Sequence, residues 1–159
     1  MPGTKLKQFL DENQVRYVSV RHSPAYTAQE IAASAHIPGR ELAKTVMVKI
    51  DGTMAMAVLA APARLDLALL RRAAGARSVT LADEKEFCGA FPDCEPGAMP
   101  PFGNLYGLKV YIDRALAEDR QIAFNAGSHA ELIQMDYHQF ERLVQPVVAN
   151  LSAERGPRG

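Results

Sequence analysis

The sequence predicts a single α/β domain, of the α+β kind, with a mixed β-sheet. Its 159 residues suffice for one domain with a hydrophobic core, and its hydrophobic and charged shares of 48% and 23% are ordinary for a globular protein. Strand hairpins alternate with helical segments along the chain, which disfavours a purely parallel sheet. No internal repeat or linker is visible, so residues 1–150 are predicted to form one unit and residues 151–159 a frayed polar tail.

Three segments at the start of the chain carry signals of secondary structure. Apolar residues at helical spacing predict a helix over residues 5–13. A β-rich run predicts a strand over residues 17–20. The pair Thr27 and Glu30 has the spacing of a capping box, which predicts a second helix that continues to about Ser34.

A β-hairpin is the clearest feature of the first half. Two β-rich runs, residues 45–50 and 53–61, flank an Asp-Gly pair, which is a strong signal of a tight turn. Leucines at helical spacing follow and predict a helix that Gly75 closes. A short strand over residues 78–81 and a capped turn at Asp83 come next.

The segment over residues 89–107 differs from the rest of the chain. Its density of glycine and proline is expected to exclude helix and regular sheet, and its apolar residues argue against disorder. A loop of this length inside a compact domain is usually functional. Further strands are predicted over residues 108–112, 121–125 and 128–135, before a final helix that opens with a capping box at Asp136 and Gln139.

Composition narrows the class of function. The 18 basic and 18 acidic residues cancel, which disfavours a protein that coats nucleic acid but leaves room for a local basic patch. The two cysteines are too few to staple a secreted domain or to complete a zinc site, and no phosphate-binding glycine motif is present, so no metal and no cofactor are expected. No signal peptide or membrane span is visible, which predicts a soluble, cytoplasmic protein with no membrane partner.

Lys44 is the first candidate for chemistry. It lies at the mouth of an apolar strand, where an ammonium group tends to be partly desolvated and can act as an oriented cation or a tuned base. The alternative is a lysine that ends the strand and extends its charge into water.

Two further segments are candidates for pocket walls. In Gly97-Ala98-Met99-Pro100-Pro101-Phe102-Gly103 the paired prolines fix the backbone, and the glycines permit a ligand to approach the main chain. In Asn125-Ala126-Gly127-Ser128-His129 backbone amides, a hydroxyl and an imidazole come together. A rigid surface loop and an exposed histidine are the alternative interpretations. A serine hydrolase is disfavoured because adjacent residues of a strand, here Ser128 and His129, point to opposite faces.

A group of arginines surrounds the helix that Gly75 closes. Two interpretations stay open for these residues, contact with a phosphate backbone and a solvated helix face. The arginines are Arg64, Arg71, Arg72 and Arg77.

The segment around Lys44 and the two candidate pocket walls together resemble the YbaK and prolyl-tRNA-synthetase-associated family of aminoacyl-tRNA editing domains. They match in order and spacing over nearly the whole chain: Ala43-Lys44-Thr45-Val46-Met47-Val48-Lys49, then Gly97 to Gly103, then Asn125 to His129. The resemblance implies a partly barrel-like sheet flanked by helices over residues 1–150, with a pocket for the aminoacylated 3′ end of tRNA. It assigns the key lysine to Lys44 and the pocket walls to Thr45, Pro100, Pro101, Phe102, Gly103, Gly127, Ser128 and His129.

The implied reaction is hydrolysis of the ester between a small mischarged amino acid and the terminal ribose of tRNA, which protects the fidelity of translation. The alanine-editing branch typically carries Asn directly after the lysine, whereas this chain has Thr45, so alanine, serine, threonine and cysteine all stay open. No synthetase domain is attached, which predicts action in trans, with aminoacyl-tRNA as the partner and an aminoacyl-tRNA synthetase as a second candidate.

Other classes of function compete with a deacylase. The first is a non-catalytic module of the same fold that binds an aminoacyl group or another small ligand and acts in regulation. A second is a Schiff-base enzyme that uses Lys44 as a covalent amine, which requires a depressed pKa. A third is a general nucleic-acid binder, which the zero net charge disfavours.

Overall fold

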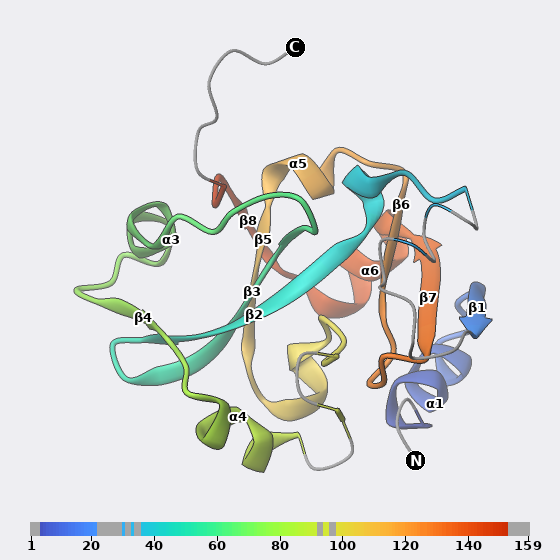
Figure 1. Ribbon diagram of the computed structural model, residues 1–159, viewed down its shortest axis with the longest axis horizontal. Helices are drawn as coiled ribbons and strands as arrows, with labels where there is room; N and C mark the ends of the chain where they lie inside the picture. Colours follow the sequence, from blue (N-terminus) through green and yellow to red (C-terminus); the bar gives the residue numbers. More distant parts are fainter. Residues whose placement is uncertain are drawn as a thin grey trace.

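The computed structural model of the chain describes residues 4–21, 30, 33, 36–91, 94–95 and 98–152 (Figure 1). Within these residues the strands form a three-stranded sheet, ordered β1-β7-β6, and a five-stranded sheet, ordered β4-β2-β3-β5-β8. One parallel bridge, between Leu42 and Ala123, links the two sheets. The predicted α/β domain with a mixed sheet is confirmed. Over the described part of the chain, however, the sheets do not close into a barrel.

The three-stranded sheet is antiparallel throughout. β1 (Tyr17–Arg21) pairs with β7 (Glu131–Asp136), which pairs in turn with β6 (Gln121–Asn125). The predicted first helix and first strand are confirmed as α1 (Thr4–Glu12) and β1. The predicted capping box at Thr27 lies outside the described residues, as does most of its helix.

The predicted hairpin is confirmed as β2 (Ala43–Ile50) and β3 (Thr53–Ala60), which pair antiparallel. Asp51 and Gly52 have φ values of 50° and 85°, and two positive φ angles in a two-residue turn match the right-handed twist of the strands. β4 (Val79–Leu81) pairs antiparallel with the outer edge of β2. On the other side, β5 (Lys109–Asp113) runs parallel to β3, and β8 (Val147–Ala149) runs parallel to β5.

The caps of two helices are set by their local sequence. α3 (Leu67–Ala74) begins at Asp66, whose carboxylate accepts hydrogen bonds from the amides of Ala68 and Leu69, and ends at Gly75 with φ 63° as predicted. α6 (Tyr137–Val144) begins at Asp136, whose carboxylate accepts from the His138 amide at 2.9 Å. The Gln139 side chain accepts from Arg142 instead of completing the predicted capping box.

Several predictions for the second half were wrong in detail. The segment over residues 89–107 contains helix at both ends, because α4 (Glu84–Ala90) includes Gly89 and a 3₁₀ turn, η2 (Gly103–Tyr106), closes at Gly107 with φ 71°. The strand expected from Ser128 begins at Glu131, because Gly127 with φ 94° holds the chain in a turn. Two short elements escaped prediction, α5 (Arg114–Ala117) and β8.

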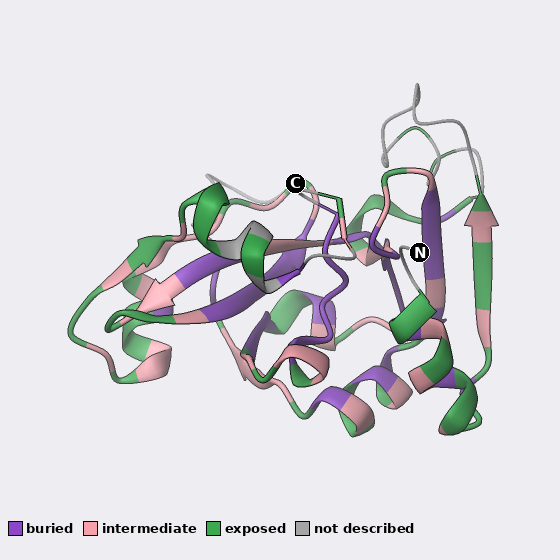
Figure 2. Cartoon of the chain, turned by 90° about the horizontal axis from the view of Figure 1, so that it is seen from below, coloured by how far each residue is buried: buried purple, intermediate pink, exposed green. Residues whose placement is uncertain are grey.

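The main core lies between the two sheets and α6, with α1 packed against it. Figure 2 shows the central strands buried and β1, an edge strand, largely exposed. One face of the five-stranded sheet and one face of the three-stranded sheet supply most of this core. Its fully buried members include Met56, Val58, Ile112, Ile122, Phe124, Ile133 and Phe140.

The opposite face of the five-stranded sheet, here called the outer face, forms a second core beneath α3. Val48, Ala57 and Tyr111 pack there with Leu70 of the helix and with Leu151. No helix among the described residues has the length and apolar character needed to cross a bilayer.

The first two residues of the predicted tail are anchored to the domain. The Leu151 amide donates to Asp113 Oδ1 at 2.9 Å, and the Ser152 hydroxyl donates to the other oxygen of this carboxylate. The remainder of the tail lies outside the described residues. The described part of the chain is therefore hydrogen-bonded to the domain as far as Ser152.

Candidate active site

The β2–β3 hairpin positions Lys44 on the outer face of the five-stranded sheet. Residues alternate between the two faces of a strand, and Ala43 and Met47 belong to the main core, so Lys44 points to the opposite side, as Val48 does. The side chain is half-buried, and Nζ donates a hydrogen bond to the carbonyl oxygen of Ala63, 2.6 Å away. The ammonium group is therefore oriented by the main chain and does not simply extend into solvent.

The junction between the two sheets brings a second polar group toward Lys44. The parallel bridge joins Leu42 to Ala123, and Lys44 and Asn125 each follow the bridge by two residues, on the same face of their strands. The Oδ1 atom of Asn125 is buried and has no hydrogen-bond partner in the described part of the chain. Buried polar atoms without a partner are rare in folded proteins.

Gly127 connects the two segments that were predicted to form pocket walls. Its amide donates to the carbonyl oxygen of Ala98 at 2.9 Å, and its own carbonyl accepts from the Glu95 amide at 2.8 Å. The Glu95 carboxylate also accepts from the His129 amide at 2.7 Å. The glycine-proline loop and the Asn125–His129 turn are therefore held together by main-chain hydrogen bonds.

Ser128 and His129 lie in this turn and not in a strand, so the argument from strand alternation against a serine hydrolase does not apply. Ser128 Oγ instead accepts a hydrogen bond from the Ala130 amide at 2.9 Å, and the structure gives no hydrogen bond between Ser128 and the ring of His129. Ser128 is half-buried and His129 is exposed. Among the described residues, Ser128 thus makes no hydrogen bond to a histidine ring of the kind that activates such a nucleophile.

The Pro100–Gly103 segment forms part of the main core. Pro100 and Pro101 are buried, and the fully buried Phe102 ring makes edge-to-face contacts with Phe124 and Phe140, with centroid distances of 5.4 and 5.3 Å. The Phe102 side chain is therefore a packing element, so a role of this residue in binding would fall to its main chain.

Gly103 is required by the protein's own backbone. A Cβ atom at this position would lie 2.7 Å from both the carbonyl oxygen of Leu108 and a methyl group of Val110. The sequence interpretation was that a ligand approaches this glycine. What approaches it in the structure is the start of β5.

Thr45 points away from Lys44. As the next residue of β2 it faces the main-core side of the sheet, in register with Val58 of β3. The structure therefore brings Lys44 toward the Asn125–His129 turn and joins that turn to the glycine-proline loop, but it places the side chains of Thr45 and Phe102 elsewhere.

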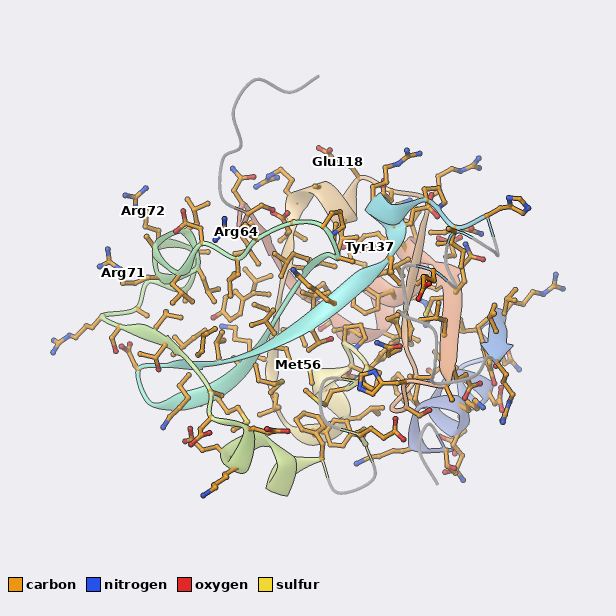
Figure 3. All side chains as sticks on the ribbon, viewed as in Figure 1. Met56, Arg64, Arg71, Arg72, Glu118 and Tyr137 are labelled. Atoms are coloured by element: carbon orange, nitrogen blue, oxygen red, sulfur yellow. The ribbon has the colours of Figure 1, made fainter. Side chains whose placement is uncertain are left out.

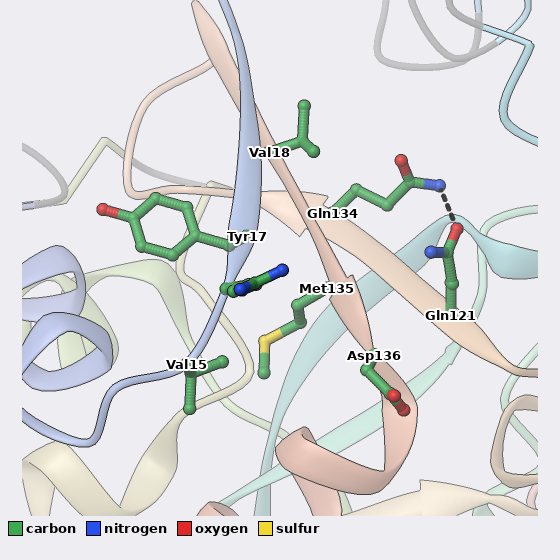
Figure 4. A pocket seen from close by; sticks show the side chains of 8 residues that line it. Val15, Tyr17, Val18, Gln121, Gln134, Met135 and Asp136 are labelled. Carbon is green, nitrogen blue, oxygen red and sulfur yellow. Dashed lines mark hydrogen bonds between the residues drawn. The ribbon is translucent and has the colours of Figure 1, made fainter.

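Two cavities lie along the three-stranded sheet, and Lys44 lines neither of them. The first, of about 610 Å³, is lined by Val15, Arg16, Tyr17, Val18, Gln121, Gln134, Met135 and Asp136 (Figure 4). The second, of about 630 Å³, is lined by Glu41, Arg120, Gln121, Asp136 and His138. None of the predicted site residues lines either cavity. The sequence did not single out these residues as a group, because they come from segments that are distant along the chain.

Acidic groups with perturbed pKa values lie close to the second cavity. Burial raises the pKa of Glu41, and the charge of Asp119 raises it further. Burial also raises the pKa of Asp119, although Arg40 lies 3.6 Å from one of its oxygens and opposes the shift. The other oxygen of Asp119 is buried without a described partner. Among the described residues, no three histidine, cysteine or carboxylate side chains come together as metal ligands do.

The fold and the site define an α+β domain that holds an oriented lysine at the junction of two sheets. The chain belongs to the family of aminoacyl-tRNA editing domains, whose sequence profile matches residues 22–143. No curated protein sequence matches the chain.

Three solved structures with the same fold each have 20% sequence identity or less to the chain. A protein proposed as a trans-editing enzyme for prolyl-tRNA synthetase superposes with a TM-score of 0.83 at 18% identity, over 96% of this chain and 97% of its own. A protein described as hypothetical superposes with a TM-score of 0.82 at 20% identity, over 94% of this chain and 99% of its own. A protein from Marinobacter aquaeolei VT8, proposed to act in signal transduction, superposes with a TM-score of 0.73 at 18% identity, over 94% of this chain but only 30% of its own.

Proposed function

We propose that the chain is a trans-acting aminoacyl-tRNA deacylase that hydrolyses the ester of a small mischarged amino acid: alanine, serine, threonine or cysteine. Family membership supports the reaction class. The observation that carries the proposal for this chain is the Lys44 ammonium, half-buried and hydrogen-bonded to the Ala63 carbonyl beside the position of Asn125. A cation oriented in this way is suited to hold an ester carbonyl or the terminal phosphate.

In the proposed reaction, the oxygen of a water molecule attacks the ester carbonyl carbon. The bond from this carbon to the ribose oxygen then breaks. The ribose oxygen takes up one of the two protons of the water, the other passes to solvent, and the amino acid leaves as a carboxylate. An aminoacyl ester is already activated, so positioning and stabilisation of the developing negative charge can supply most of the rate enhancement. No side-chain nucleophile is needed.

Lys44 is the best candidate for the group that stabilises this charge. The amide of Gly127, another possible donor at the site, already donates to the carbonyl oxygen of Ala98. The ammonium of Lys44 can exchange the Ala63 carbonyl for the substrate oxygen, because a main-chain carbonyl is a neutral acceptor and the developing oxyanion is a charged one.

Deacylation assays with tRNAs charged with alanine, serine, threonine or cysteine test the proposal. The parent chain is expected to hydrolyse at least one of the four, and Lys44→Ala to lose about 100-fold or more. Lys49→Ala is the matched control, because Lys49 lies on the same strand and its ammonium pairs with Glu86 at 2.7 Å, away from the site.

A folded parent chain that leaves all four substrates intact would contradict the proposal. The non-catalytic binding module is then the better interpretation. Its support is that a similar fold makes up part of a protein proposed to act in signal transduction. Binding of aminoacyl-tRNA without turnover would identify such a module.

A further inference from the structure

Four arginines surround α3 on the side of the molecule that carries the outer face. We name this group, Arg64, Arg71, Arg72 and Arg77, the arginine surface. All four are exposed, and none forms an ion pair with any described residue. Figure 3 shows Arg64 beside α3, with Arg71 and Arg72 extending outward from the helix.

The acidic groups close to these arginines along the chain bind to the main chain. Asp66 accepts hydrogen bonds from two amides of α3. Asp51 accepts from the amides of Arg77 and Ser78, at 3.0 and 2.9 Å. Neither carboxylate forms an ion pair with a guanidinium group of the arginine surface.

Stabilisation of the helix end does not explain all four arginines. Cations in the last turn of a helix can satisfy its final carbonyl groups. Here the amide of Gly75 already donates to the carbonyls of Arg71 and Arg72, and the amide of Ala76 donates to Arg71 as well. Moreover, Arg64 and Arg77 lie outside the helix.

The zero net charge of the chain conceals this concentration of positive charge. Apart from the arginine surface, 14 basic residues face 18 acidic ones, so the rest of the chain is acidic. A surface that keeps four guanidinium groups without a described ion-pair partner, on an otherwise acidic protein, is suited to an anionic partner.

The arginine surface adjoins the candidate active site along the chain. Arg64 directly follows Ala63, whose carbonyl oxygen accepts from Lys44. The eight residues of α3 extend over about 12 Å. An RNA duplex displays phosphates a few ångströms apart, so several can lie against this length at once.

We propose that the arginine surface binds the phosphate backbone of the tRNA acceptor stem while the 3′ end occupies the site at Lys44. This inference rests on the proposed deacylase function. Arginine suits the role because its planar guanidinium binds phosphate through two parallel hydrogen bonds. Contacts to phosphate carry no sequence information, so the surface sets position and affinity and does not select the tRNA.

The test compares two substrates that share the aminoacylated 3′ end, of which only one carries the acceptor stem. One is the aminoacyl-tRNA that the chain hydrolyses, and the other is the trinucleotide CCA carrying the same amino acid. The triple variant Arg71→Gln, Arg72→Gln, Arg77→Gln is expected to lower kcat/KM for the tRNA by about tenfold or more at low salt. It should leave hydrolysis of the trinucleotide unchanged. For the tRNA, the slope of log affinity against log salt should become shallower by roughly one for each phosphate that the variant no longer binds.

A second triple variant, Arg16→Gln, Arg120→Gln, Arg142→Gln, is the matched control. These arginines are also exposed and also form no ion pair with a described residue, but they lie around the three-stranded sheet and α6. The control should lose little activity on either substrate. Equal losses in the two triple variants would overturn the proposal, because they would reflect net charge alone.

Two other results would overturn the inference without affecting the proposed function. One is full activity and an unchanged salt dependence of the first variant on tRNA. The other is an equal loss on tRNA and on the trinucleotide, which would place the effect at the site and not at the stem. If the parent chain hydrolyses neither substrate, the proposed function fails. The role of the arginine surface is then tested by measuring how tightly the parent and the first variant bind uncharged tRNA. Binding that is at least tenfold weaker in the first variant supports the inference that this surface binds phosphates, and equal binding overturns it.

Discussion

Lys44 and Asn125 each lie two residues beyond the same inter-sheet bridge, and their side chains are on the same face. The ammonium group of Lys44 donates a hydrogen bond to a main-chain carbonyl, and the side-chain oxygen of Asn125 is buried without a described hydrogen-bond partner. An asparagine at the start of a turn often accepts from the amide two residues on. That amide, of Gly127, donates to Ala98 instead, so the usual structural role of such an asparagine is not fulfilled.

Replacement of Asn125 should therefore not destabilise the fold. We expect Asn125→Leu, which has a similar shape and no polar atoms, to leave the free energy of unfolding unchanged or to raise it by up to about 1 kcal/mol. Urea denaturation measures this value. A decrease of more than about 1 kcal/mol would mean that the carboxamide forms a structural hydrogen bond after all.

Gly103→Ala is expected to destabilise the protein by about 1–3 kcal/mol, because its Cβ would meet the Leu108 carbonyl at 2.7 Å. Gly89→Ala is the matched control, since it lies in α4 with open space around the added atom. Alanine there should raise stability by about 0.5–1 kcal/mol through its better helix propensity. Thermal unfolding of both variants distinguishes a required glycine from a tolerated one.

The pH dependence of stability should reveal the ion pair between Glu131 and Lys7. Burial raises the pKa of Glu131, but hydrogen bonds from Lys7, at 2.7 Å, and from Ser19 outweigh it, so the net shift is downward. A carboxyl group with a lowered folded-state pKa contributes stability above its ordinary value near 4.5 and loses it as the pH falls through the folded-state value.

We therefore expect Glu131→Gln to cost about 2 kcal/mol at pH 7 and progressively less as the pH falls below about 4.5. Urea denaturation of the parent and the variant at both pH values measures the difference. Glu12→Gln, at an exposed position of α1, is the control and should change little. A cost that does not depend on pH would show that the charge of Glu131 is unimportant.

Asp66→Ala should destabilise the protein by about 1 kcal/mol, because the carboxylate caps α3 through the amides of Ala68 and Leu69. Asp66→Asn keeps a side-chain acceptor and should retain most of the stability. Guanidinium denaturation of the two variants separates the hydrogen bonds of the cap from the negative charge. Equal losses in both would assign the effect to the charge.

Features set by neighbouring residues could be predicted from the sequence. The Asp51-Gly52 pair determined its hairpin because two positive φ angles suffice to reverse the chain. Gly75 closed its helix for a similar local reason. The family could also be recognised from sequence, and its sequence profile matches residues 22–143.

Features set by distant residues could not be predicted. The sequence pattern did not distinguish a pocket wall from a core element at Phe102, because its ring neighbours, Phe124 and Phe140, come from later elements. The partners of Gly127 lie in a loop about thirty residues earlier in the chain. The short elements α5 and β8 have too few residues to show a periodicity.

The Leu42–Ala123 bridge also bears on how the chain becomes functional. Each sheet can form its own hydrogen bonds, but Lys44 and the Asn125 turn come together only after the sheets dock. During refolding, the proposed deacylase activity should therefore return later than the circular dichroism of helices and strands. A substitution that loosens this docking would leave a chain with native-like secondary structure and no function, so activity reports on the completeness of tertiary assembly.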